Sequence, residues 1–296
     1  MEPIRIVVRR GSFVESVHLV HAVAVQDGSV VTQAGDAALL TSLRSSAKPF
    51  QALPLARARE DLDDRDVAIA AASHRAEPEQ IEAVRALLRK ADATQDDLEC
   101  GVQDGRPAAP IYHNCSGKHA GMLATCRAHG WESAGYRLPE HPLQQEILAT
   151  VGSAAEVDTG EIATATDGCG VVAFAVPLER AALMFSHLEQ QDGGARVVAA
   201  MRGHPRLLGG SGATDTALME ALPGWIAKGG AEGLLCAAGP EGLGVALKAG
   251  DGGYRALGPA AVSFLARLGE SVDDDLARAR VQNSRGEDVG EIVAEP

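Results

Sequence analysis

The sequence predicts a mixed α/β fold of the α+β kind, with an antiparallel sheet from N- and C-terminal strands flanked by helices and a helical middle lobe. Strand-like apolar runs lie at the start of the chain and again after residue 225, and helical apolar spacing dominates between them. An Asp27-Gly28 pair between two apolar runs marks a tight antiparallel hairpin. With 296 residues, 46% of them hydrophobic, the chain can bury a large core without disulfides.

The first elements expected are strands over residues 4–8 and 17–25, the second entering the Asp27-Gly28 turn. A helix is expected over residues 47–58, with one proline tolerated in its first turn and Pro54 ending or kinking it. Residues 67–72 form a short unbroken apolar run, which predicts a buried strand.

The middle and end of the chain follow the same rules of spacing. Helices are expected over residues 79–91, from the end of the 113–119 segment to about 126, and over 142–151, 178–188 and 195–202. A glycine-rich turn at 167–170 leads into the apolar run 171–176, short glycine-bounded strands are expected over 225–228, 233–238 and 242–248, and a last helix over 259–268. We expect one domain, 1–296, with a sheet lobe from roughly 1–45 and 205–296 and a helical lobe from roughly 46–204.

Composition excludes several classes of protein. The net charge of −13, without a basic cluster, argues against nucleic acid as a partner. No apolar stretch approaches the roughly 20 residues of a membrane span, and the charged first ten residues are unlike a signal peptide, so no membrane partner is expected. Five widely spaced cysteines suit reduced thiols, which favours a cytoplasmic protein.

Ser45 and Lys48 are spaced as a nucleophile and its base at a helix start. One helical turn brings residues i and i+3 to one face, and a neutral lysine can take a proton from a serine. The alternative is a serine N-cap beside a solvated lysine. Lysine is scarce here, with 5 against 22 arginines, and only lysine can lose its charge and act as a base.

Two further segments complete a pattern known from serine hydrolases of the β-lactamase and penicillin-binding type. Those enzymes combine S-x-x-K with a second serine-containing loop and a K-T-G-like strand. Here Ser73-His74 and Lys228-Gly229-Gly230 follow Ser45 and Lys48 in that order. Taken alone, Lys228 could equally be a solvated lysine at a strand end.

Cys115, Lys118 and Cys169 form a second group, because both cysteines lie in polar, glycine-bearing segments rather than in apolar runs. The cysteines could ligate zinc as thiolates, although no C-x-x-C or H-x-x-H spacing is present. Cys115 could instead be a nucleophile with Lys118 as its base, and Ser116 competes for that role.

Five segments together resemble the thermolabile asparaginase II family, the class 3 L-asparaginases, over nearly the whole chain. They are Arg44-Ser45-Ser46-Ala47-Lys48-Pro49-Phe50-Gln51, Ala72-Ser73-His74, His113-Asn114-Cys115-Ser116-Gly117-Lys118-His119-Ala120-Gly121-Met122, Thr166-Asp167-Gly168-Cys169-Gly170 and Lys228-Gly229-Gly230-Ala231-Glu232-Gly233. The resemblance implies a serine β-lactamase-like fold, hydrolysis of L-asparagine to L-aspartate and ammonia, and a homodimer.

The resemblance also implies roles for single residues. The catalytic set would be two tandems, Ser45 with Lys48 and Ser73 with Lys228, and the zinc site would be Cys115, Lys118 and Cys169. The implied substrate contacts are Arg44, His74, Asn114, His119 and Asp167. This chain departs from the family at Arg75-Ala76-Glu77, where relatives carry a small residue or glycine before the glutamate, and at Ala213, near which relatives carry an arginine.

The resulting hypothesis is that Ser45, activated by neutral Lys48, attacks the side-chain amide, that backbone N–H groups near the helix start stabilise the oxyanion, and that Ser73 and Lys228 relay protons. Zinc would position substrate or organise loops, and no organic cofactor is expected. Two alternatives stay open: a serine hydrolase acting on β-lactams or peptides, and a non-catalytic amino-acid-binding protein of the same fold.

Overall fold

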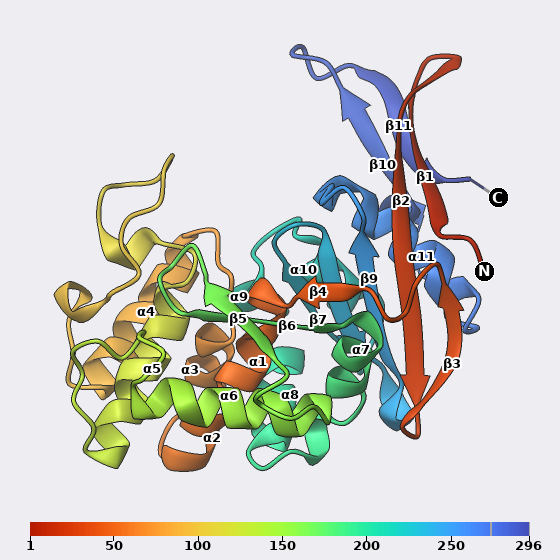
Figure 1. Ribbon diagram of the computed structural model, residues 1–296. Coiled ribbons are helices and arrows are strands. Elements are labelled where there is room, and N and C mark those ends of the chain that lie inside the picture. The colour runs from red at the N-terminus through yellow and green to blue at the C-terminus, as the bar shows by residue number, and fades with distance from the viewer. Residues whose placement is uncertain (273, 296) are drawn as a thin grey trace. The chain divides into compact units, whose positions relative to one another are not determined.

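The computed structural model describes residues 1–272 and 274–295 (Figure 1). The chain forms two compact units: unit 1 is made of Met1–Thr41, Pro177–Ser186 and Ala217–Pro296, and unit 2 of Ser42–Val176 and His187–Thr216. Strands from both ends of the chain share one antiparallel sheet and helices dominate the middle, so the predicted mixed α/β class is confirmed.

Unit 1 contains an eight-stranded antiparallel sheet in the order β10-β11-β1-β2-β9-β8-β7, with β3 also paired to β2. Its strands are β1 (Ile4–Arg10), β2 (Phe13–Gln26), β3 (Ser29–Ala34), β7 (Ile226–Gly230), β8 (Leu234–Ala238), β9 (Gly244–Ala249), β10 (Arg278–Gln282) and β11 (Asp288–Ala294). Asp27 and Gly28 both have positive φ, 50° and 73°, which is the backbone of the tight hairpin that this pair predicts.

Helices pack on this sheet within unit 1. The longer ones are α7 (Leu178–Ser186), which packs on β2, β8 and β9, and α11 (Leu257–Ala266), which packs on β1 and β11. The short ones are α12 (Asp274–Ala277), η5 (Pro240–Gly242) and η6 (Tyr254–Ala256), and α10 (Thr214–Ala221) runs from unit 2 into unit 1. A Cβ on Gly244 would collide with the backbone of α7, so glycine permits that close approach.

Unit 2 is mainly helical. Its helices are α1 (Lys48–Gln51), α2 (Leu53–Ala58), α3 (Asp64–Ala70), α4 (Pro78–Lys90), α5 (Ser116–His129), α6 (Pro142–Ala155), α8 (Gly194–Gly203) and α9 (Pro205–Leu208), with η1 (Arg44–Ala47), η2 (Gln95–Asp97), η3 (Pro110–Tyr112) and η4 (Leu188–Gln190). A small sheet has the order β4-β6-β5, from β4 (Leu40–Ser42), β5 (Ala163–Thr166) and β6 (Val172–Pro177). In the described part of the chain no helix is both long and apolar enough to cross a bilayer.

Two sequence-based expectations are wrong. Residues 67–72 do not form a strand, because α3 covers Asp64–Ala70 and begins at an N-cap, Asp63, whose carboxylate accepts the Asp66 N–H. The helix expected over residues 47–58 is divided into η1, α1 and α2, with the break at Ala52 before Pro54.

Candidate active site

Ser45 and Lys48 lie on one helical turn at the beginning of unit 2. Ser45 belongs to η1, Lys48 begins α1, and the Lys48 backbone N–H donates to the Ser45 carbonyl. Arg44, just before them, has φ 44°, a left-handed conformation that non-glycine residues adopt rarely and that is frequent at functional sites. The turn places the side chains of residues i and i+3 on the same side of the helix.

The Lys48 side chain is buried and points to the segment after α3. Its Nζ donates to the Ala72 carbonyl at 2.6 Å and to the Ser73 Oγ at 2.8 Å, and the residue is only 1% exposed. A neutral amine at this distance could accept the Ser73 proton instead of donating one. The sequence predicted Lys48 as the partner of Ser45 and did not anticipate its contact with Ser73.

Lys228, predicted as the partner of Ser73, lies in the other unit. It is fully buried on β7, opposite Cys236 on β8, and its Nζ donates to the Gly229 carbonyl at 3.2 Å. Since Ser73 belongs to unit 2, the Ser73–Lys228 tandem stays a prediction.

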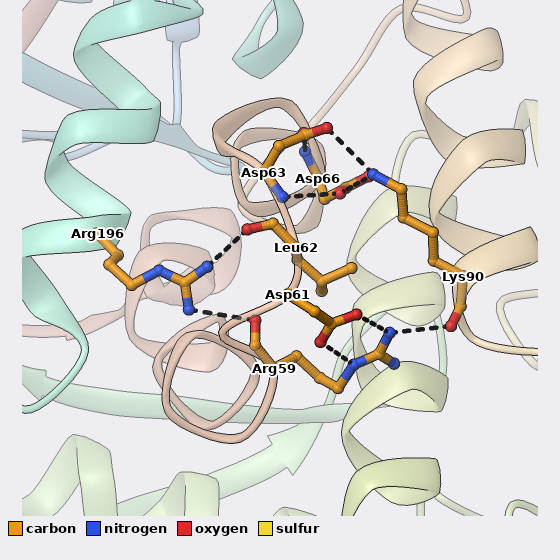
Figure 2. A network of polar contacts seen from close by, with 7 residues as sticks. All are labelled: Arg59, Asp61, Leu62, Asp63, Asp66, Lys90 and Arg196. Carbon is orange, nitrogen blue, oxygen red and sulfur yellow. Dashed lines mark hydrogen bonds and ion pairs between the residues drawn. The ribbon is translucent and has the colours of Figure 1, made fainter.

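The position of Ser73 depends on α3, whose first turn is anchored by the polar network in Figure 2. Lys90 Nζ, at the end of α4, contacts the carboxylates of Asp63 and Asp66, and the Asp63 N–H donates to Asp66 at 3.1 Å. Arg196 donates to the Leu62 carbonyl at 2.8 Å just before the helix. The anchored helix ends at Ala70, directly before the Ala72–Ser73 segment that Lys48 contacts.

Gln80 is a functional candidate that the sequence analysis missed. Its side chain is buried; Oε1 accepts the backbone N–H groups of Arg75 and Glu77 at 2.9 and 3.0 Å, and Nε2 donates to the Arg206 carbonyl at 2.9 Å. The Ser73 N–H donates to Leu208 O at 2.8 Å in the same region. Gln80 therefore ties the segment after Ser73 to α9. The signal available in the sequence was a glutamine at the third helical position before an apolar run.

The departure at Arg75-Ala76-Glu77 has a structural explanation. Arg75 Nη1 donates to the Ser211 carbonyl at 2.6 Å, and the Ser211 N–H donates to Glu77 Oε1 at 2.9 Å. Both backbone polar groups of Ser211, in the loop of residues 209–212, are therefore hydrogen-bonded. Ala76, between Arg75 and Glu77, has φ 62°, a strained value for a residue with a Cβ. Arg75 thus holds the loop next to Ala213.

His74 is buried and neutral. Its Nδ1 accepts the Ala76 N–H at 3.1 Å, so Nε2 carries the hydrogen and donates to Ser116 Oγ, which in turn donates to the Ile111 carbonyl at 2.7 Å. Burial, with the nearby charges of Lys48 and Arg106, lowers the pKa of His74 to about 3. The ring therefore connects the segment after Ser73 to the start of α5 rather than serving as a base.

Cys115, Lys118 and Cys169 converge in the interior of unit 2. All three are buried, and Lys118 Nζ donates to Cys169 Sγ at 3.0 Å. A hydrogen bond from Cys169 is the main cause that lowers the pKa of Cys115 well below its ordinary value; burial opposes this shift, and the charges of Lys48 and Lys118 add to it. The bond to Cys115 and burial raise the pKa of Cys169. Burial lowers the pKa of Lys118, but the charges of Cys169 and Cys115 raise it more.

This donor set fits zinc in its chemistry when the Lys118 amine is neutral, because a protonated amine has no lone pair for a metal. Tetrahedral Zn²⁺ can bind two sulfur atoms and one amine nitrogen. Around such an ion, a sulfur ligand and a nitrogen ligand lie roughly 3.6 Å apart. The 3.0 Å between Lys118 Nζ and Cys169 Sγ needs only a small opening. Residues 1–272 and 274–295 contain no group of three or more His, Cys, Asp or Glu suited to a metal. Cys115 and Cys169 are two residues of these types, and the third donor of the candidate site is the Lys118 amine.

Arg44 and Asp167, two of the substrate contacts that the resemblance implies, contact each other. Arg44 Nε donates to Asp167 Oδ1 at 2.8 Å, and the Gly168 N–H donates to the same oxygen at 2.7 Å. The two side chains are 29% and 12% exposed, so solvent reaches both. The structure therefore brings together a cation and an anion beside the Cys169 loop.

His119 and Asn114 flank the same helix start. His119 is buried on α5; its Nδ1 is 2.7 Å from the Tyr136 hydroxyl, and among the described residues its Nε2 has no hydrogen-bond partner. Burial and the charge of Lys118 hold the pKa of His119 well below its ordinary value. The Asn114 carbonyl accepts the His74 N–H at 3.2 Å, and its own N–H donates to Gln103 Oε1 at 2.9 Å.

The fold places the chain among mixed α/β proteins whose antiparallel sheet joins both chain ends, with the candidate site residues in the helical unit and on β7. Within that class, the family model described as L-asparaginase II matches residues 6–294, and the chain belongs to this family. Its members are L-asparaginase-like amidohydrolases, the kind of enzyme that the resemblance implied.

Two solved structures are similar to the chain. A protein assigned as a β-lactamase from Bacteroides dorei shares 16% identity with a TM-score of 0.44, over 78% of this chain and 84% of that chain. A β-lactamase from Mycobacterium bovis shares 16% identity with a TM-score of 0.37, over 84% and 94% of the respective chains. The comparison with curated proteins finds no match.

Proposed function

We propose that this protein is an L-asparaginase that hydrolyses L-asparagine to L-aspartate and ammonia through a serine activated by Lys48. The observation that supports this most directly is the buried Lys48 Nζ at 2.8 Å from Ser73 Oγ, one helical turn after Ser45. Family membership supports an amide substrate. The zwitterion of asparagine complements Arg44 and Asp167, which carry opposite charges and are solvent-accessible.

In the proposed reaction the serine hydroxyl adds to the side-chain amide carbon and its proton passes to neutral Lys48. The C–N bond then breaks, Lys48 returns the proton to the leaving nitrogen, and ammonia departs from an acyl-enzyme ester. Water adds to the ester with the same base, which releases aspartate and regenerates the hydroxyl. Lys228 is proposed as the second lysine, as the family resemblance implies.

Ser45 is the proposed nucleophile and Ser73 the proton relay, but the Lys48–Ser73 contact favours Ser73 as a second candidate. The two assignments differ in what each alanine variant does. Ser45→Ala should abolish ammonia release from asparagine and should accumulate no acyl-enzyme by mass spectrometry, whereas Ser73→Ala should slow both steps. A Ser45→Ala protein that keeps near-normal ammonia release while Ser73→Ala loses it reverses the assignment.

Zinc at Cys115, Lys118 and Cys169 is a further part of the proposal. Bound there, the ion would supply a Lewis acid and a fixed positive charge for positioning substrate. The Cys115 and Cys169 thiols and the Lys118 amine would hold it. Elemental analysis of protein purified without added metal should find zinc, and Cys169→Ser should lose it. Absence of zinc together with full activity in chelator would refute this part.

The homodimer and the cytoplasmic location stay predictions from the family resemblance and the sequence. Sedimentation of the purified chain measures its mass in solution, and fractionation of producing cells measures location. A fluorescent penicillin distinguishes this proposal from the β-lactam alternative. It should label a serine hydrolase that acts on β-lactams and leave an L-asparaginase unlabelled.

A further inference from the structure

Tyr254 lies against the backbone next to Lys228. It is the first residue of η6 in unit 1, and Gly229 directly follows Lys228 on β7. A Cβ built on Gly229 would overlap the Tyr254 hydroxyl and lie 3.2 Å from the Tyr254 Cζ. Lys228 Nζ donates to the Gly229 carbonyl at 3.2 Å. The phenol and the amine therefore approach the same residue of the strand.

A polar cluster that the proposed mechanism does not use fixes the segment around Tyr254. Arg255 Nε donates to His18 Nε2 at 3.0 Å, and Arg255 Nη2 donates to Ser16 Oγ at 3.1 Å. Arginine can only donate, so His18 Nε2 accepts and His18 Nδ1 carries the hydrogen that goes to Asp251 Oδ2 at 2.6 Å. The buried His18 on β2 thus holds the residue after Tyr254 and the turn before it.

The turn before Tyr254 is fixed as tightly as the residue after it. Asp251 Oδ1 accepts the Gly253 N–H at 2.9 Å. A Cβ on Gly253 would come within 2.6 Å of His18 Nδ1, closer than real Cβ atoms allow, so this position requires glycine. The residues before and after Tyr254 are therefore both hydrogen-bonded in fixed positions beside β2, which limits where the Tyr254 side chain can lie.

β7 is the strand that needs such support. It is the last strand in the order of the sheet and pairs with β8, and Gly229 and Gly230 lack side chains that could fix their backbone. A residue that must hold an amine for catalysis gains from a side chain packed against its strand, because small misplacements of a catalytic group are costly.

We propose that Tyr254 is a positioning residue for Lys228: its side chain against Gly229 fixes the end of β7, and His18, Asp251 and Arg255 hold Tyr254 in place. The proposal rests on the proposed function only in treating Lys228 as a catalytic lysine. It also explains why Gly229 and Gly253 are glycines.

The first test is a double-mutant cycle between Gly229→Ala and Tyr254→Phe. Tyr254→Phe should lower kcat about tenfold with KM nearly unchanged, since the contact orients a catalytic group rather than binding substrate. Gly229→Ala should cost more, and adding Tyr254→Phe should recover part of that loss, because the clashing oxygen is gone while the ring Cζ stays in tight contact. Gly203→Ala is the matched control, since a Cβ there meets nothing within 4 Å. Additive losses without rescue would overturn the proposal.

The second test does not need turnover and so separates this inference from the proposed function. The chain has 5 lysines, and in a protein labelled with ¹³C-lysine the Lys228 signal is assigned by Lys228→Arg. Tyr254→Phe and Arg255→Gln should both shift that signal, and Tyr112→Phe should not. An unchanged Lys228 signal in both variants would refute the positioning role. A shifted signal in a protein that releases no ammonia from asparagine would instead refute the proposed function alone. Arg255→Gln leaves Gly229 intact, so the test survives if Gly229→Ala fails to fold.

Discussion

At the residue scale, the Lys48 amine is the group on which the proposed chemistry depends. Lys48→Arg keeps a positive charge and several N–H donors but cannot act as a base at neutral pH. We expect it to lower kcat/KM for asparagine by about 10³-fold, in the range that loss of a general base produces. Ammonia release measures this, with Lys248→Arg as the control, since Lys248 lies half-buried on β9 in unit 1 and takes no part in the proposed chemistry. A Lys48→Arg enzyme with more than a tenth of normal activity would contradict the assignment.

His74 supplies a pH-dependent stability that can be measured. The folded protein protonates His74 near its pKa of about 3, but the unfolded chain does so near the ordinary His pKa of about 6.5. Between these values the unfolded state binds more protons, so the free energy of unfolding falls as the pH falls. From pH 6.5 to pH 5 this group should remove about 2 kcal/mol.

Urea unfolding of the wild type and of His74→Asn at these two pH values tests the effect. The variant is less stable at both, since it loses the ring between Ala76 and Ser116, but its stability should change less with pH. Equal pH slopes for the two proteins would show that His74 is not the group responsible.

The sequence identified candidate site residues more reliably than it identified the contacts between them. It named Ser45, Lys48 and Ser73 from their motifs, but the contact of Lys48 with Ser73 depends on where α3 ends, which no local spacing encodes. Gln80 was missed for the same reason: its function lies in four backbone partners from segments far apart in the chain.

At the element scale, the start of α3 determines how firmly Ser73 is held. Lys90→Met would leave the Asp66 carboxylate, 3% exposed, without its cation. We expect a loss of about 1–3 kcal/mol in the free energy of unfolding, together with lower activity, because α3 leads directly to Ala72 and Ser73. Asp61→Ala breaks only the exposed ion pair with Arg59 in the same network (Figure 2), and it should change stability by less than about 0.5 kcal/mol.

Thermal or urea unfolding measures both variants, and ammonia release under stabilising conditions separates folding from activity. Similar losses for Lys90→Met and Asp61→Ala would mean that burial of Asp66 does not matter. The error over residues 67–72 has the same origin. A short apolar run suits a buried helix as well as a strand, and the deciding signal was the Asp63/Asp66 capping pair rather than the run itself.

At the scale of the whole molecule, the sequence predicted that strands from the two chain ends pair, but it did not predict every strand that takes part. The sequence indicated that N- and C-terminal strands share a sheet, and it predicted β1, β2, β7, β8 and β9 close to their observed positions. It missed β10 and β11: β10 alternates polar and apolar residues, but over only five residues, none of them buried, and Gly290 and Glu291 interrupt the apolar pattern of β11. β11 nevertheless pairs with β1 along residues 6–10, so the last segment of the chain completes the sheet.

This arrangement predicts that the C-terminal hairpin is required for folding of unit 1. Removal of residues 278–296 would expose the whole edge of β1 and uncover part of α11, which packs on β1 and β11. Exposed apolar edges promote association, so we expect the truncated chain to aggregate and to lose cooperative unfolding. The control keeps both strands and the loop length and replaces only the exposed turn residues Ser284 and Arg285 with alanine, which should fold normally because neither side chain is buried. Sedimentation and thermal unfolding of both proteins decide the matter: a truncated chain that stays monodisperse with an unchanged transition would show that β1 does not need its C-terminal partner.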